Sequence, residues 1–166
     1  MSSKSTAKLL SCVTLAIVAS GFISSCGPPD YPGYKHAPYT VRGKRYHPVH
    51  PHRAVGLEHR GGASWYDERG FFSSGTTALG EKFRAGDMAG AHKTLPLPCK
   101  VKVTNLRNGK TATIRLNDRG PFIAGRILDV TPAVAKKLGF KDQGLTDVHI
   151  RVLSVGDGKH RIKRRR

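Results

Sequence analysis

Alternating apolar and polar residues mark two neighbouring segments in the second half of the chain. Residues 100–105 and 110–117 both alternate, and Arg107-Asn108-Gly109 lies between them. Asn-Gly between two alternating runs is the strongest short-range signal for a β-hairpin. We therefore expect these segments to form an antiparallel pair.

Shorter patterns predict the remaining elements. Residues 63–66, 126–130 and 147–155 are typical of strands. One short helix is expected after Thr131, because a capping threonine precedes Pro132, and Gly139 follows two lysines at the far end. Several short strands, glycine-rich turns and a single helix predict a small, mostly β barrel over residues 61–156. That length is enough for one core.

The first 25 residues have the pattern of a secretion signal. Lys4 and Lys8 precede an apolar run over residues 9–23, and small residues lead from it to Cys26. The run is shorter than the roughly 20 solidly apolar residues that a membrane-spanning helix needs. We expect cleavage after residue 25, and an uncleaved anchor is the alternative.

Residues 26–60 carry most of the prolines and five histidines, without a helix or strand period. This composition predicts a disordered tether. His47, His50 and His52 are spaced for weak binding of a transition metal, but prolines hold them on an extended chain, so a solvated linker is the default interpretation. Residues 159–166 are basic apart from Ile162, so residues 157–166 are predicted to form a disordered electrostatic tail.

The charge of the chain calls for an anionic neighbour. Loss of Lys4 and Lys8 with the signal lowers the formal net charge from +18 to +16. Nucleic acid is the usual partner of so basic a chain. Export removes that partner, so cell-wall carboxylates and anionic lipid headgroups are the expected neighbours.

Cleavage would also leave Cys99 as the one free thiol if Cys26 carries lipid, so no internal disulfide is expected. Cys99 precedes a strand-like run, where a small buried hydrophobic residue is the expected role. A nucleophilic pair of Cys99 with His92 is the alternative.

Asp118 is the first candidate for chemistry. It lies in Asn117-Asp118-Arg119-Gly120-Pro121-Phe122, where an alternating strand stops. A carboxylate at a strand end is held rigidly yet is open to a ligand, which suits proton transfer. The alternative is that Asp118 only closes an Asx-type turn.

Several separate segments together resemble one known family, rare lipoprotein A. They are Ala63-Ser64-Trp65-Tyr66, Thr76-Thr77-Ala78-Leu79-Gly80-Glu81-Lys82-Phe83, Ala91-His92-Lys93-Thr94-Leu95-Pro96, Val103-Thr104-Asn105, Asn108-Gly109, the Asp118 motif and Arg126-Ile127-Leu128-Asp129-Val130. The resemblance covers essentially the whole compact region.

This resemblance implies a six-stranded double-psi β-barrel with one or two short helices. It also implies a lytic transglycosylase that cuts the β-1,4 bond between N-acetylmuramic acid and N-acetylglucosamine in peptidoglycan, leaving a 1,6-anhydro end. No cofactor or metal is expected. The residues around Cys26 resemble a lipobox, and Gly27 after it fits sorting to the outer membrane. The expected location is the periplasmic face of the envelope, with division proteins as candidate partners.

Carried over by motif, Asp118 corresponds to the proposed catalytic acid, with Glu81 and His92 as further polar residues of the groove. We expect Glu81 to raise the pKa of Asp118 or to steady positive charge, and His92 to orient one of the two carboxyl groups. Glu81 as a solvated surface acid and His92 as the cap of a turn are the alternatives. Leu79 stands where the family commonly has asparagine.

Five residues are candidates for contact with the glycan. Aromatic faces stack on sugar rings, although an alternating strand places one of two adjacent aromatic residues in the core. Arg119 is a candidate for a substrate carboxylate, with a structural ion pair as the alternative. The five are Trp65, Tyr66, Phe72, Arg119 and Phe122.

A second class of function remains open, namely a non-catalytic protein that binds the cell wall or division proteins. Glu81, His92 and Asp118 together favour the enzyme. Leu79 and the lack of a glycan-binding repeat, found in many members of the family, favour the second class.

Overall fold

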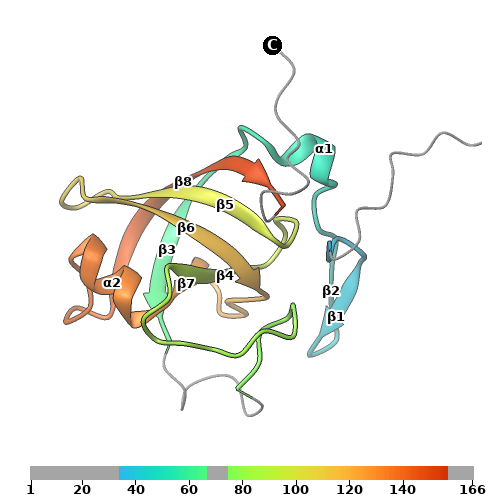
Figure 1. The fold of residues 1–166 in the computed structure, drawn as a ribbon, viewed down its shortest axis with the longest axis horizontal. Coiled ribbons are helices and arrows are strands. Elements are labelled where there is room, and N and C mark those ends of the chain that lie inside the picture. The colour runs from blue at the N-terminus through green and yellow to red at the C-terminus, as the bar shows by residue number, and fades with distance from the viewer. Residues whose placement is uncertain (1–33, 67–74, 157–166) are drawn as a thin grey trace, which may run out of the picture.

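The computed structural model describes residues 34–66 and 75–156. Six strands close into a barrel in the order β3-β7-β4-β6-β5-β8 (Figure 1), which confirms the expected small β barrel. The strands are β3 (Glu58–Trp65), β4 (Ala89–His92), β5 (Cys99–Asn105), β6 (Thr111–Asp118), β7 (Arg126–Val130) and β8 (Leu145–Val155).

The hairpin expected from Asn-Gly is β5–β6. Val101 faces Ile114 across this antiparallel pair, and Gly109 has a φ of 72° in the connecting turn. A positive φ is easy for glycine because it has no Cβ. The alternation then places Val101, Val103, Ile114 and Leu116 in the core.

Two strand pairs are parallel, β3 with β7 and β4 with β6. Parallel strands need long crossover connections, so residues far apart in sequence meet at the short strand β4. Ala91 on β4 faces Asp118 of β6 on one side and Asp129 of β7 on the other. Gly90 permits this close packing, because a Cβ there would lie 2.8 Å from the carbonyl oxygen of Asp129.

The expected helix is α2 (Pro132–Leu138). The Thr131 hydroxyl accepts a hydrogen bond from the Val134 N–H at 3.5 Å, and Gly139 ends the helix with a φ of 71°. Its buried face, Val134 and Leu138 among others, joins the core. Cys99 also lies in this core with no exposed surface, as expected for a small buried hydrophobic residue.

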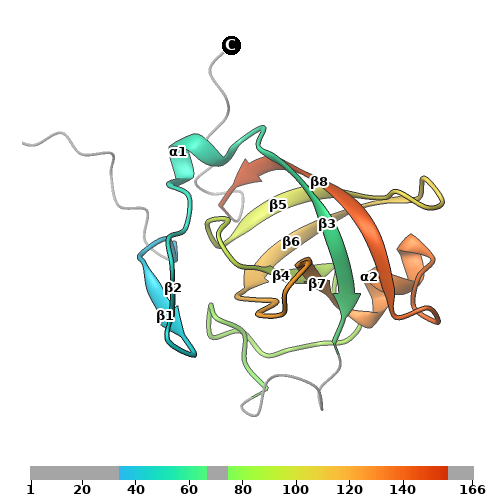
Figure 2. The ribbon, with the colours of Figure 1, turned by 180° about the vertical axis from the view of Figure 1, so that it is seen from behind.

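Residues 34–60 differ from the expected tether. They contain the hairpin β1 (Tyr39–Val41) and β2 (Lys44–Tyr46), the helical turn α1 (Pro51–Ala54) and the start of β3. The hairpin lies beside the barrel, on the side away from α2 (Figures 1 and 2). The prediction of disorder is therefore wrong over this range.

Residues 34–60 are held in place by ring stacking and by backbone bonds to the barrel. A search for local periodicity cannot detect such contacts. The Tyr39 and Tyr46 rings stack with centroids 5.3 Å apart. Backbone bonds of 2.8 Å from Lys35 N–H to the Leu97 carbonyl, and of 2.7 Å from Val49 N–H to the Thr94 carbonyl, fasten the segment to the barrel.

Within residues 34–66 and 75–156, no helix is both long and apolar enough to cross a bilayer. The predicted signal, the lipidation site Cys26, the basic tail and Phe72 all lie outside the described residues.

Candidate active site

Asp118 ends β6 and is almost completely buried, with 2% of its surface exposed. Its Oδ1 accepts hydrogen bonds from the backbone N–H groups of Ala78, at 2.8 Å, and Arg119, at 2.7 Å. Its Oδ2 is buried and has no hydrogen-bond partner within residues 34–66 and 75–156. An Asx-type turn would use the N–H two residues on, so the bond from Arg119, the next residue, is not the turn-closing bond of the alternative.

This environment favours the neutral acid. Burial raises the pKa of Asp118 to about 6, against the opposing effects of the two N–H donors and the Arg119 charge. Because both N–H groups point at Oδ1, the proton of the neutral form belongs on Oδ2. Asp118 therefore offers a single, unbonded proton-donating oxygen near neutral pH.

The Glu81 carboxylate bonds two other residues of β6, Arg115 and Asn117, and does not bond Asp118. It forms two hydrogen bonds with the Arg115 guanidinium, at 2.6 and 2.7 Å, and accepts a third from Asn117 Nδ2 at 2.9 Å. Hydrogen bonding by Arg115 holds the pKa of Glu81 below its ordinary value. Glu81 does not figure among the causes of the raised pKa of Asp118, which is chiefly an effect of burial.

The Glu81 carboxylate instead anchors the loop that holds Asp118. Thr77 and Glu81 close this loop with a 2.8 Å backbone bond, and the Leu79 N–H reaches the Asn117 carbonyl at 3.3 Å. Ala78, between them, supplies its N–H to Asp118. The contact of Leu79 with β6 is made by its backbone.

His92 is buried and neutral. Its Nδ1 accepts hydrogen bonds from the N–H groups of Thr94, at 3.1 Å, and Leu95, at 3.0 Å, so its proton lies on Nε2. That nitrogen lies 3.2 Å from Nδ1 of His59. Burial, with the nearby His59, lowers the pKa of His92 to about 3.

Neither ring nitrogen of His92 bonds Asp118 or Glu81, since backbone and His59 occupy both. His92 instead shapes the turn over residues 92–95. Its capping bonds match the alternative expected from sequence. They also leave no nitrogen for Cys99, whose pKa burial raises to about 12.

A second carboxyl group lies near Asp118 that the sequence did not single out. Asp129 and Asp118 both pair with Ala91, and paired residues on adjacent strands point to the same face. Asp129 is 6% exposed, accepts a short hydrogen bond from the Ser64 hydroxyl and pairs with Arg126 at 3.0 Å. Burial raises its pKa as well.

The signal for Asp129 was present in the sequence as a single acid inside the apolar run Ile127-Leu128-Asp129-Val130. The partners His59, Ser64 and Arg115 gave no such signal. Each lies on an alternating strand, and only the barrel closure sets it against its partner.

Trp65, the last residue of β3, and Tyr66, which follows it, separate as strand alternation requires. Tyr66 packs on Phe83, with ring centroids 5.1 Å apart, and its pKa is raised first by burial and then by the charges of Asp118 and Asp129. Tyr66 is thus on the acid side of the barrel. Trp65 instead donates its indole N–H to the Lys141 carbonyl at 2.9 Å, beyond α2.

Arg119 donates to backbone carbonyls, including that of Leu95 at 2.5 Å, and lies over the Tyr39 ring, 5.2 Å from its centroid. Phe122 packs against Tyr46 with centroids 5.4 Å apart. Among the residues described, no three His, Cys, Asp or Glu side chains are grouped to hold a metal ion.

Comparison with known proteins places this geometry in a family. The family model described as lytic transglycolase matches residues 58–150, which is more than half of the chain and covers β3 to β7 and the first part of β8. The chain belongs to this family. The barrel described above is the double-psi β-barrel expected from the sequence.

Named relatives agree with the lytic transglycolase assignment. An endolytic peptidoglycan transglycosylase RlpA of Pseudomonas aeruginosa (strain UCBPP-PA14) is 46% identical over 122 residues, covering 74% of this chain and 35% of that protein. A protein of the same name from Neisseria meningitidis (strain Z2491) is 45% identical over 118 residues, covering 71% and 48%. The chain thus spans about a third to a half of the length of these relatives.

Two solved structures also resemble the chain. A Streptomyces papain inhibitor is 20% identical with a TM-score of 0.47, covering 60% of this chain and 96% of that one. An expansin of Clavibacter michiganensis is 15% identical with a TM-score of 0.46, covering 61% and 53%. The fold assignment rests on the strand order and the family match.

Proposed function

We propose that this protein is a lytic transglycosylase of peptidoglycan that cuts the β-1,4 bond between N-acetylmuramic acid and N-acetylglucosamine. Family membership and the names of the relatives support the substrate class and the reaction. The observation that carries the proposal is the buried Asp118 carboxyl group, whose pKa burial raises to about 6 and whose Oδ2 is unbonded among the described residues.

The reaction needs one group that gives and then recovers a proton. In the first half, Oδ2 of Asp118 protonates the glycosidic oxygen as the bond to the muramic acid C1 breaks and an oxocarbenium-like centre develops. In the second half, the 6-hydroxyl of the same sugar attacks C1 and its proton returns to Asp118. The products are an anhydro end and a free hydroxyl, and no water is consumed.

Asp118 must be uncovered for this transfer, because only 2% of its surface is exposed in the free protein. The Ala78 and Arg119 N–H groups hold the carboxyl plane while the other oxygen faces the substrate. Binding of the glycan strand therefore has to displace whatever covers Oδ2. The same burial produces the raised pKa that makes the acid useful.

We assign Asp129 to stabilising positive charge on the sugar ring. It shares a face with Asp118 and lies two strand spacings away, about 10 Å between backbones. Glu81 and His92 are positioning residues in this proposal. Glu81 anchors the loop that carries Ala78, and His92 shapes the turn whose carbonyls hold Arg119.

The decisive experiment is to incubate purified sacculi with the protein and to analyse the soluble products by mass spectrometry. We expect 1,6-anhydro-muropeptides from the wild type and none from Asp118→Asn, with sacculus binding retained. Asp142→Asn is the matched control, because Asp142 is exposed in the turn after α2. Equal release by Asp118→Asn would contradict the proposal.

The burial of Asp118 also favours a second candidate, a wall-binding protein without catalysis. In that case sacculi would bind the wild type but yield no anhydro products at any pH. Action at the periplasmic face of the envelope, with a lipid on Cys26 and recruitment by division proteins, completes the proposal. Cys26→Ala should abolish incorporation of labelled palmitate.

A further inference from the structure

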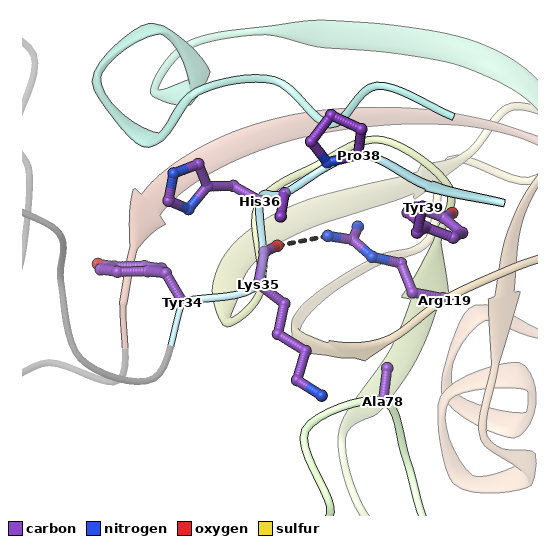
Figure 3. Close-up of a pocket in the computed structure, with 8 residues that line it drawn as sticks. Tyr34, Lys35, His36, Pro38, Tyr39, Ala78 and Arg119 are labelled. Atoms are coloured by element: carbon purple, nitrogen blue, oxygen red, sulfur yellow. Dashed lines mark hydrogen bonds between the residues drawn. The ribbon is translucent and has the colours of Figure 1, made fainter. Parts of the chain in front are cut away.

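The segment before the barrel forms one wall of a pocket next to Asp118. This pocket has a volume of about 580 Å³. One wall is made by residues 34–39, and the other by Ala78 and Arg119 (Figure 3). Ala78 also donates its N–H to Asp118, so an occupant of the pocket lies one residue away from the catalytic acid.

Arg119 gives the pocket a positive charge that interacts with the neighbouring Asp118 carboxyl group without a direct ion pair. Its guanidinium donates to the carbonyl oxygens of Lys35 and Leu95, with the first contact visible in Figure 3. No acidic side chain among residues 34–66 and 75–156 forms an ion pair with it. A partly buried cation that is not directly ion-paired is costly, and an anionic ligand would stabilise it further.

Lys35 adds a second positive charge at the edge of the pocket. Its backbone is fixed by Leu97 and Arg119, while its exposed side chain extends toward Ala78 (Figure 3). The rest of the wall is largely apolar and includes the rings of Tyr34 and Pro38, whereas the Tyr39 ring is already in contact with Tyr46 and Arg119. Flat apolar faces beside cationic groups suit a sugar ring that carries an acidic substituent.

We propose that this pocket is a subsite for a carboxylate carried on a peptidoglycan sugar, bound by Lys35 and Arg119 next to Asp118. This inference rests on the proposed function, because it places the acidic sugar beside the bond that is cut. Two groups of peptidoglycan could supply this carboxylate, namely the lactyl group of muramic acid and the stem peptide attached to it. A volume of about 580 Å³ is within the usual range for a small-ligand site.

The test measures binding in the Asp118→Asn background, so that no ligand is consumed. Four soluble glycans are titrated by calorimetry: peptide-free muramic acid oligosaccharides, their lactyl methyl esters, peptide-bearing strands and neutral N-acetylglucosamine oligosaccharides. We expect at least one carboxylate-bearing glycan to bind about threefold or more tightly than the neutral ones, the size of one exposed ion pair. The peptide-free and peptide-bearing arms identify the source of the carboxylate.

Lys35→Gln should remove most of that preference, and Lys35→Glu should reverse it. Neither change should disturb the fold, because only the backbone of Lys35 makes the anchoring bonds. Lys102→Gln is the matched control, since Lys102 is an exposed lysine of β5 that is not part of the pocket. Added salt should weaken the preference in the wild type.

Equal binding of acidic and neutral glycans, or no measurable binding of any glycan, would overturn the subsite. The subsite is also overturned if Lys35→Gln and Lys102→Gln lower the preference equally. In that case the preference would come from the overall positive charge of the protein and not from Lys35 in the pocket. These outcomes are distinct from failure of the proposed function. That failure is read from the absence of anhydro products, whatever the binding preference.

Discussion

Ala78 donates its backbone N–H to Oδ1 of Asp118 at 2.8 Å, across 40 residues of sequence. This bond fixes one oxygen of the acid and leaves the proton to the other. It also couples the acid to the loop anchored by Glu81 and to the pocket beyond Ala78.

The release of anhydro products should fall as pH rises above about 6. Asp118 has a pKa of about 6 and acts in its protonated form. Between pH 6 and pH 8 its protonated fraction drops about fiftyfold, and the rate should drop with it. Initial rates on solubilised glycan strands across this range measure the effect. A rate that is flat or rising from pH 6 to 8 contradicts the assignment.

Asp118→Asn should stabilise the fold at neutral pH. The folded-state pKa lies above the ordinary value of 3.8, so the folded protein binds the proton more tightly than the unfolded chain. The stabilisation of the fold by the protonated Asp118 is fully present below about pH 4 and is lost as the pH rises through about 6. Asparagine cannot ionise, so its advantage grows with pH to at most about 3 kcal/mol.

Thermal unfolding at pH 4 and pH 7.5 tests this gain. The difference in Tm between Asp118→Asn and the wild type should be larger at pH 7.5, while Asp142→Asn should show no such trend. A constant difference at both pH values would mean that burial does not set the ionisation of Asp118.

Glu81→Gln should lower activity by about tenfold or more, because small displacements of catalytic groups are costly. The change weakens the pairing with Arg115 that fixes the loop. Loosening the Ala78 N–H bond also removes an effect that lowers the pKa of Asp118, so the pH profile should move upward. If Glu81→Gln acted only by lowering the global stability of the fold, the pH profile of the activity would not shift.

Glu58→Gln is the control for this variant. Glu58 pairs with Arg151 at 3.5 Å and with His149 at 3.1 Å on the barrel surface, away from the site. It should keep the wild-type activity and pH profile. A loss equal to that of Glu81→Gln would show that any broken ion pair has the same consequence.

Asp129→Asn should lower turnover by about a hundredfold, the usual scale for losing one electrostatic group at a reacting centre. Ser64→Ala removes only the hydroxyl that bonds this carboxyl group, so its effect should be smaller. Measuring turnover and KM on glycan strands separates an effect on the transition state from an effect on substrate binding. If Asp129→Asn changes KM alone, Asp129 holds substrate and does not act on the transition state.

Local patterns predicted much of the barrel, because each depends on neighbouring residues only. Asn108-Gly109 between alternating runs located β5–β6, and Thr131 with Gly139 located α2. The segment over residues 34–60 was missed. Its hairpin depends on stacking of Tyr39 on Tyr46 and on backbone bonds to the barrel, which no local period reveals.

The candidate site was predicted in part. The motif around Asp118 singled out the carboxyl group that lies buried at the end of β6, but the partners of Glu81 and His92 were not foreseen. Both residues bond groups from other strands, Arg115 and His59, instead of the acid itself. Alternation predicts which side of a strand faces inward, but not which strand becomes its neighbour.

By itself, the sequence determined strands β3, β5, β6, β7 and β8 in outline, the turn at Asn108-Gly109, the caps of α2 and the placement of an acid at a strand end. These depend on side-chain alternation and on backbone preferences over a few residues. The tertiary structure alone decided that β4 lies between β6 and β7, which brings Asp118 and Asp129 to one face. It also decided that burial, and not a neighbouring carboxylate, raises the pKa of Asp118, because desolvation depends on everything packed around the group.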